Sequence, residues 1–307
     1  MLTNILQVGT FPALMQREVT ERVIPWTEQD LAARPELKQQ AQGLITRSNI
    51  RISEELIRSL PNLRIIASCG VGYDLIPVSF ARDRGIVVSN TPEVLNAAVA
   101  ELCIGMLIGL LRQLHTADQF VRKSLWLKQA YPLTKGLAGK RVGIIGMGRI
   151  GKEIGLRLEP FGTAIAYFSR QRKPLPWHHV PSLTELANAS DILIAVVPGG
   201  AETRHMIDAK ILRALGPQGY FVNIARGSVV DEEALLTALE TGEIAGAALD
   251  VYASEPAINQ RFLNLDNVLL SPHAGSATTE TRQAMIQLAI TNLEAFFATG
   301  KILTPVY

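Results

Sequence analysis

Three residues with complementary chemistry, Arg226, Glu255 and His273, each follow an apolar run that predicts a buried strand. The planar guanidinium of Arg226 matches a carboxylate and can also polarise a carbonyl group, and Gly227 beside it lets backbone approach a ligand. His273 is the best proton donor, because histidine titrates near neutral pH without a large perturbation. A carboxylate such as Glu255 beside the imidazole would favour its charged form and orient the ring. Together these residues predict proton transfer to a substrate that carries a carboxylate.

A glycine-rich segment, GMGRIG, occupies residues 146–151, between a predicted strand and a predicted helix. In this context the first glycine permits a tight turn, the second lets backbone approach a pyrophosphate, and the third allows close helix–sheet packing. The N-terminus of the helix adds N–H groups and the positive end of a dipole. The alternative is a glycine turn without a ligand. The segment predicts a dinucleotide site formed by Gly146, Gly148, Arg149, Ile150 and Gly151.

Ser169, Arg170 and Arg172 lie about 20 residues after the glycine loop, where an NAD site normally carries an acidic side chain for the ribose 2′-hydroxyl. The two guanidiniums can clamp a phosphate through charge-assisted hydrogen bonds, and Ser169 can donate one more. We expect no carboxylate close enough to repel that phosphate. These residues predict NADP(H) as the cofactor and reduction as the direction; the alternative is a basic surface loop.

A hydride donor, a carboxylate binder and a proton donor are the three requirements for reducing a 2-keto acid. Arg226 would hold the substrate carboxylate, and His273 would protonate the carbonyl oxygen as the hydride arrives. Glu255 would keep that acid protonated. The candidates follow the last three predicted strands, at the edge where open α/β sheets bind ligands.

Apolar runs that alternate with helical patterns must position these residues. In the first part of the chain we expect strands at residues 5–9, 23–26, 43–46, 63–68 and 86–89. A second series of six begins after Gly139, at residues 141–145, 164–168, 192–197, 220–224, 247–251 and 268–271. Continuous Val, Ile, Leu and Ala runs suit strands of a parallel sheet that is buried on both faces. The second series matches a doubly wound dinucleotide fold.

Two long helical patterns, at residues 97–122 and 278–297, flank the second series, and Gly300 ends the latter. We interpret them as crossings between two doubly wound α/β domains. Residues 1–96 plus 277–307 would form a flavodoxin-like substrate domain. Residues 97–276 would form an inserted NADP-binding Rossmann domain. An active site would then lie in the cleft between the domains.

The bulk composition narrows the class of protein. With 307 residues, 48% hydrophobic and 19% charged, the chain fits one large or two medium globular domains. A net charge of +2 argues against nucleic acid or an anionic membrane as a partner. The spacing of Cys69 and Cys103 predicts neither a metal site nor a structural disulfide. The apolar run 100–111 is too short to span a bilayer, and a cytoplasmic location is expected.

Five motifs in order resemble the D-isomer-specific 2-hydroxyacid dehydrogenase family over nearly the whole length. They are SCGVGYD at residues 68–74, the glycine loop, NIARGSVVD at 223–231, LDVYASEP at 249–256 and SPH at 271–273. The resemblance implies that Arg226 binds the substrate carboxylate, that His273 is the acid/base and that Glu255 pairs with it. It also implies that the N–H groups of Val71 and Gly72 receive the carboxylate and that Asp250 holds the nicotinamide carboxamide. Members are usually homodimers, joined through their cofactor domains.

Within the family, the chain is most similar to NADPH-dependent hydroxypyruvate, glyoxylate and hydroxyphenylpyruvate reductases. The strings YFSR at 167–170 and LTPV at 303–306 are typical of that branch. One departure is VPGG at 197–200, where these reductases more often have Pro-Leu-Thr, near the adenine end of the cofactor. The remaining predicted cofactor contacts are Val197, Pro198, Ile224 and Ala225.

Trp126 resembles a residue in an arm that reaches toward the partner subunit. It would either help close the substrate pocket or pack in the dimer interface. The alternative to a reductase is a non-catalytic, dinucleotide-sensing corepressor, a class that the family also contains. The presence of Arg226, Glu255 and His273 favours the enzyme. The phosphate-selecting arginines disfavour oxidation of a phosphonate or formate.

Overall fold

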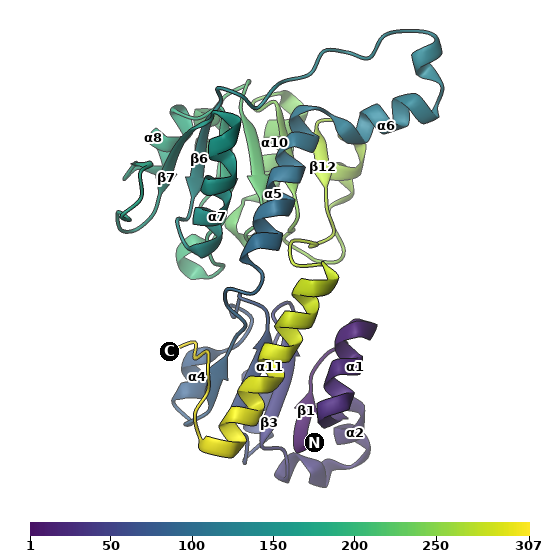
Figure 1. The fold of residues 1–307 in the computed structure, drawn as a ribbon, viewed down its shortest axis with the longest axis vertical. Helices are drawn as coiled ribbons and strands as arrows, with labels where there is room; N and C mark the ends of the chain where they lie inside the picture. Colours follow the sequence, from purple (N-terminus) through teal and green to yellow (C-terminus); the bar gives the residue numbers. More distant parts are fainter. The chain divides into compact units, whose positions relative to one another are not determined.

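The computed structural model describes residues 1–307 and divides the chain into two compact units. The first comprises Met1–Leu95 and Ser276–Tyr307, and the second comprises Asn96–Gly275. Each contains one parallel sheet with helices on both faces (Figure 1). The predicted fold class, two doubly wound α/β domains, is confirmed. The assignment of substrate to one unit and cofactor to the other stays a prediction.

The sheet of the first unit has the order β2-β1-β3-β4-β5, which is the flavodoxin-like order. Its strands are β1 (Leu2–Gln7), β2 (Val23–Thr27), β3 (Gly43–Arg47), β4 (Ile65–Cys69) and β5 (Val87–Ser89). Its helices are α1 (Ala13–Arg22), α2 (Glu28–Ala33), α3 (Glu54–Arg58), α4 (Val78–Arg82) and α11 (Thr279–Thr299). The helix α11 ends at Gly300, whose φ of 75° is left-handed, as the sequence predicts.

The sheet of the second unit has seven parallel strands in the order β12-β11-β10-β9-β6-β7-β8. The strands are β6 (Arg141–Ile145), β7 (Ala164–Phe168), β8 (His178–His179), β9 (Ile192–Ala195), β10 (Tyr220–Asn223), β11 (Gly246–Leu249) and β12 (Val268–Leu270). Counted from β6, this is the dinucleotide-fold order 3-2-1-4-5-6 with β12 added. The sequence predicted six of these strands; β8 was missed because two residues are too few for a periodic pattern.

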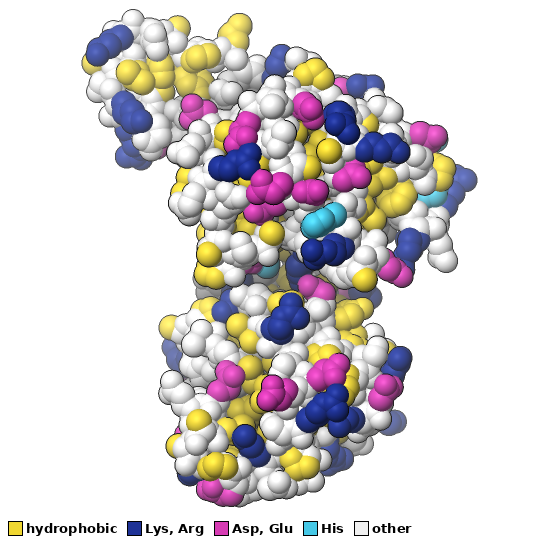
Figure 2. Space-filling view, turned by 180° about the vertical axis from the view of Figure 1, so that it is seen from behind, with side chains coloured by type: hydrophobic (Ala, Val, Ile, Leu, Met, Phe, Trp, Pro, Cys, Tyr) yellow, Lys and Arg dark blue, Asp and Glu magenta, His cyan; other side chains and the backbone are white.

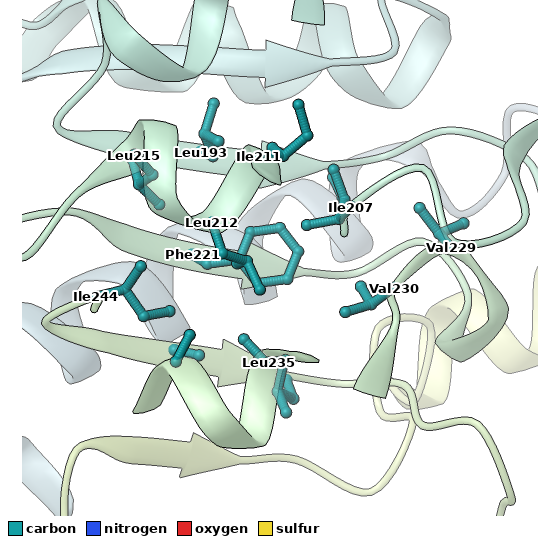
Figure 3. Close-up of a cluster of buried hydrophobic side chains, with 14 of the residues drawn as sticks. Leu193, Ile207, Ile211, Leu212, Leu215, Phe221, Val229, Val230, Leu235 and Ile244 are labelled. Carbon is teal, nitrogen blue, oxygen red and sulfur yellow. The ribbon is translucent and has the colours of Figure 1, made fainter. Parts of the chain in front are cut away.

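The helices of the second unit cover both faces of its sheet (Figure 1). They are α5 (Asn96–Leu111), α6 (Leu114–Arg122), α7 (Arg149–Leu158), α8 (Leu183–Asn188), α9 (Ala209–Leu215) and α10 (Glu232–Thr241). A hydrophobic core between the sheet and α8–α10 surrounds Phe221 of β10 (Figure 3). Each fully buried side chain of this kind contributes about 1.5–3 kcal/mol. The core therefore holds β9 and β10 firmly, and with them the loops that follow these strands.

In the second unit, the carboxyl ends of four strands lie earlier than the apolar runs predicted. The strand β9 ends at Ala195 rather than Val197, and β10, β11 and β12 end one or two residues early. Some of the residues that follow remain buried although they leave the ladder, and Ile224 and Val251 are examples. Burial thus continues past the last strand residue, and an apolar run cannot mark where the strand stops. The residues in question belong to the loops that carry the predicted site.

The single helix predicted at residues 97–122 is wrong, because the chain breaks into α5 and α6 at an angle of 59°. Gln113 adopts a left-handed conformation, with φ 48° and ψ 46°, between them. Most of α5 is buried against the sheet and α7, whereas Phe120 is the buried residue of α6. A helix that is apolar on most sides needs protein around it. The helix α5 therefore ends where the surrounding sheet and helices no longer cover it. No single helix is long and apolar enough to cross a membrane. Only the bent pair α5 and α6, taken together, has the length and the apolar composition of a membrane span.

The visible surface carries interspersed acidic and basic side chains (Figure 2). This distribution agrees with the net charge of +2. Cys69 and Cys103 are buried free thiols rather than a disulfide. Burial raises the pKa of each thiol to about 12, so both stay protonated at neutral pH.

Candidate active site

The glycine loop turns from β6 into α7 with its three glycines in different environments. Gly146 has a φ of 102°, and a Cβ there would lie 2.9 Å from the carbonyl oxygen of Val196. A Cβ on Gly151 would lie 2.2 Å from the carbonyl oxygen of Gly146, so the helix packs directly on the turn. Gly148, the N-cap residue of α7, faces open space. The loop is tight at both ends and open at its centre, where first-turn amides without intrahelical acceptors suit a pyrophosphate.

The segment that follows β7 is held by its own hydrogen bonds. The Ser169 hydroxyl donates to the Gln171 carbonyl at 2.6 Å. The buried Tyr167 hydroxyl accepts the Lys173 N–H at 2.8 Å and lies 3.2 Å from the Lys173 carbonyl oxygen. His179 Nε2 lies 3.1 Å from the Ser169 carbonyl oxygen. These contacts fix the backbone that presents the predicted 2′-phosphate ligands.

The expectation that no carboxylate lies near this segment is wrong. Arg170 Nη1 lies 3.1 Å from a carboxylate oxygen of Glu202, a residue of the short 3-10 helix Ala201–Thr203. The two side chains are 85% and 82% exposed, and such pairs contribute about 0–1 kcal/mol. A phosphate that binds Arg170 must therefore compete with Glu202. Because the ion pair of Arg170 and Glu202 is weak, this competition costs the phosphate little binding energy. The sequence could not show this contact, because Glu202 follows another strand.

Glu255 and His273 meet directly, although 18 residues separate them. His273 Nδ1 lies 2.6 Å from Glu255 Oε2, and Glu255 Oε1 accepts the Tyr252 N–H at 3.0 Å. A carboxylate only accepts hydrogen bonds, so we assign the proton to Nδ1. Nε2 is then the nitrogen that can give a proton to a substrate. The imidazole is one-third exposed, which leaves room for such a transfer.

The pKa of the Glu255 carboxyl lies below its usual value. Burial is the largest single influence and acts to raise this pKa, but it is outweighed by the other contributions. The hydrogen bond and charge of His273 lower it, as do the Tyr252 amide and the charge of Arg226. Glu255 therefore stays ionised as the pH falls below neutrality and keeps orienting the ring of His273.

The turn that carries Arg226 packs against the loop that carries Glu255. A Cβ on Gly227 would lie 1.9 Å from the carbonyl group of Tyr252, so only glycine fits there. The absence of a side chain at Gly227 is thus required by the protein's own backbone, and the predicted approach of this backbone to a ligand stays a prediction. Arg226 Nη1 donates to the Ala225 carbonyl at 2.8 Å, which orients the guanidinium. The sheet order places Arg226, Glu255 and His273 after three adjacent strands, β10, β11 and β12.

Asp250 holds the loop of His273. Its Oδ1 accepts hydrogen bonds from the Ser271 hydroxyl at 2.5 Å and the Ala274 N–H at 2.7 Å, and its Oδ2 accepts the Gly275 N–H at 2.9 Å. His273 itself has a φ of 54°, a left-handed conformation that is uncommon outside glycine. Asp250 therefore stabilises the turn that aims the imidazole. Its predicted contact with the nicotinamide carboxamide stays a prediction.

Tyr252 also positions this loop, and sequence reasoning missed it. Its hydroxyl accepts the Ser271 N–H at 3.2 Å and lies within 3.0 Å of the Leu249 and Ser271 carbonyl oxygens. Burial raises the pKa of Tyr252 to about 12, so the hydroxyl keeps its proton. The only signal was an aromatic residue directly after a strand, a pattern that equally predicts a core side chain.

The other predicted site residues divide between the two units. Val197 and Pro198 follow β9, and Val197 lies against Gly146; Ile224 and Ala225 are buried after β10. Arg149 and Ile150 begin α7. Every predicted cofactor and catalytic residue thus belongs to the second unit, at or beyond the carboxyl ends of its strands. Val71 and Gly72 belong to the first unit, after β4.

Comparisons with known proteins agree with this architecture. Residues 104–275 match the family model of the D-isomer specific 2-hydroxyacid dehydrogenase, NAD binding domain. A glyoxylate/hydroxypyruvate reductase A of Arabidopsis thaliana is 46% identical over 253 residues, which cover 82% of this chain and 81% of that protein. A hydroxyphenylpyruvate reductase of Plectranthus scutellarioides is 42% identical over 285 residues, which cover 92% and 90%.

A solved structure extends the likeness to the whole chain. It is an NADPH-dependent glyoxylate/hydroxypyruvate reductase from Sinorhizobium meliloti, in complex with NADP and malonate. The two chains superpose with a TM-score of 0.93 at 42% identity, over 99% of this chain and 96% of the other.

Proposed function

The chain belongs to the D-isomer-specific 2-hydroxyacid dehydrogenase family, and from this premise we propose that it is an NADPH-dependent reductase of small 2-keto acids. Hydroxypyruvate and glyoxylate are the first candidate substrates, with arylpyruvates next, and the products are D-2-hydroxy acids. The observation that carries the proposal is the 2.6 Å pair of His273 and Glu255 beside Arg226. The same unit contains the glycine loop, whose open centre fits a dinucleotide.

The proposed mechanism assigns one task to each residue. When bound, the reduced dinucleotide supplies the hydride for the keto carbon. Arg226 holds the substrate carboxylate through its guanidinium, together with the backbone amides of Val71 and Gly72. His273 donates a proton from Nε2 to the keto oxygen and regains one from solvent. Glu255 holds the imidazole by Nδ1 and orients its ring. One hydride and one proton thus convert the keto acid into the hydroxy acid.

Oxidation of NADPH with keto acids of rising size tests this function directly. Glyoxylate, hydroxypyruvate and phenylpyruvate form the first panel, and chiral analysis of the product checks for the D-isomer. We expect turnover with at least one small keto acid. If a broad panel gives no turnover although NADPH binds, a dinucleotide sensor would be the better description.

We propose that Ser169, Arg170 and Arg172 make NADPH the preferred cofactor. The kcat/KM for NADPH should exceed that for NADH. Replacing both arginines with alanine should reduce this ratio at least about 10- to 100-fold, since the loss of even one hydrogen bond to a charged group costs about 1.5–3 kcal/mol. The matched control is Glu202→Gln, which removes the carboxylate that competes for Arg170. It should keep or increase the preference. Equal or better efficiency with NADH in the wild type contradicts this assignment.

We also propose that the chain forms a homodimer through the segment that follows α5, residues 114–133, which we call the arm. Apolar side chains of this arm are exposed, and Figure 2 shows hydrophobic groups along it. They are Leu114, Val121, Trp126, Leu127 and Leu133. We take this exposed apolar surface as the contact with a second copy of the chain, because such surfaces are typical of protein–protein contacts. Light scattering should therefore report twice the mass of the chain, and replacing Trp126 and Leu127 with serine should shift the protein toward the monomer. A monomeric wild type would contradict the proposal.

A further inference from the structure

The last seven residues fold back onto the edge strand β5 of the first unit. The Val306 N–H donates to the Val88 carbonyl at 3.0 Å, and Pro305 pairs with Ser89 in an antiparallel bridge. This tail contains the LTPV string at residues 303–306, for which the proposed reaction has no role. Hydrogen bonds connect this tail, through Asn90, to the loop that begins at Gly70.

Asn292 of α11 fixes the start of the tail. Its side chain is fully buried, and its Oδ1 accepts the N–H groups of Leu303 at 2.9 Å and Thr304 at 3.1 Å. Its Nδ2 donates to the Leu288 carbonyl and to the Thr304 hydroxyl, both at 2.9 Å. All the hydrogen-bonding positions of this amide are therefore used. The Thr304 side chain is held in one orientation.

Thr304 in turn forms hydrogen bonds with Asn90. Its hydroxyl accepts from Asn292, so its single proton points to the Asn90 carbonyl, at 2.6 Å. The Asn90 N–H donates back to the Thr304 carbonyl at 3.3 Å. The Asn90 side chain, 8% exposed, then donates from Nδ2 to the Val71 carbonyl at 2.9 Å. A continuous set of hydrogen bonds thus joins α11, the tail and the loop after β4.

Neighbouring contacts hold the other side of this loop. The Gly70 N–H donates to the Thr91 hydroxyl, and the Thr91 N–H donates to the Gly70 carbonyl, both at 2.9 Å. Gly70 has a φ of 149°, and a Cβ there would lie 2.1 Å from the Ser48 hydroxyl. The backbone before Val71 is therefore fixed by these contacts. The orientation of the Val71 carbonyl is set by its hydrogen bond from Asn90.

The direction of the Val71 carbonyl decides the direction of the Gly72 N–H. The two groups belong to one planar trans peptide and point in opposite directions. A bond from Asn90 that holds the carbonyl on one side therefore presents the N–H on the other. We propose that Thr304, acting through Asn90, is a positioning residue for the Gly72 amide that receives the carboxylate of the keto acid. This inference rests on the proposed function and assigns a role to the carboxyl-terminal tail.

The test is Thr304→Val, which removes the hydroxyl and keeps the branched shape. The KM for the keto acid should rise about 5- to 10-fold, the effect of one weakened hydrogen bond, whereas kcat and the KM for NADPH should stay within about twofold. Thr304→Ser should restore the wild-type KM. The matched control is Thr299→Val, whose exposed hydroxyl bonds only within and just beyond α11. It should change none of these values. A loss of stability alone would lower the fraction of active enzyme. It would therefore lower the apparent kcat and leave the KM for the keto acid unchanged.

Hydrogen exchange of residues 68–74 provides a measurement that does not need activity. Exchange should be faster in Thr304→Val than in the wild type, Thr304→Ser or Thr299→Val. The inference is overturned if exchange in this segment is unchanged, or if the KM for the keto acid stays within twofold of the wild type. If the wild type reduces no keto acid, the proposed function fails, and exchange alone then decides whether Thr304 positions the loop.

Discussion

Replacing His273 with alanine is expected to lower kcat for keto acid reduction by about 10²- to 10⁴-fold, the usual contribution of a positioned general acid. The imidazole is the group whose Nε2 can deliver a proton, because Nδ1 is engaged by Glu255 at 2.6 Å. The affinity for NADPH should stay near wild type, since the glycine loop lies at β6 and α7 and does not depend on this side chain. Steady-state kinetics and a fluorescence titration with NADPH measure the two effects separately.

The control for this substitution is His178→Ala, an exposed histidine of β8 in the same unit. It should leave both kcat and NADPH affinity unchanged. If His273→Ala kept kcat within tenfold of the wild type, another group would have to supply the proton. A parallel loss of NADPH affinity would instead indicate that the substitution disturbs the loop held by Asp250.

Replacing Arg226 with alanine is the second change with a large expected effect. Two charge-assisted hydrogen bonds to the substrate carboxylate would be lost, and kcat/KM should fall about 10²- to 10³-fold. Most of the loss should appear as a higher KM, with a smaller decrease in kcat from weaker polarisation of the keto group. Arg226→Lys should recover only part of it, because an ammonium group retains the charge but not the two-point geometry.

The matched control is Arg213→Ala, which removes an exposed arginine from the last turn of α9. Its kinetic constants should equal those of the wild type. Near-normal KM and kcat in Arg226→Ala would show that the carboxylate is held elsewhere, with the amides of Val71 and Gly72 as the remaining predicted ligands.

Much of the fold could be predicted because its signals are local. Buried parallel strands require continuous apolar runs, and the predicted runs located eleven of the twelve strands that the structure contains. Gly146 and Gly151 stand where a left-handed turn and a helix contact exclude any side chain, so their spacing carries information by itself. Apart from the two-residue strand β8, the errors lie where a residue is buried but no longer belongs to a strand, at the carboxyl ends of the strands, and where the predicted helix breaks, at Gln113.

The sequence by itself determined the class of fold, the glycine loop and the residue types available for acid–base chemistry, since each depends on neighbours along the chain. Only the tertiary structure decided which side chains meet. Glu255 contacts His273 across 18 residues, Glu202 contacts Arg170 across 32, and Thr304 contacts Asn90 across 214. The physical reason is that such contacts depend on strand order and on the paths of loops between strands. No local pattern encodes these, whereas backbone sterics and burial are expressed residue by residue.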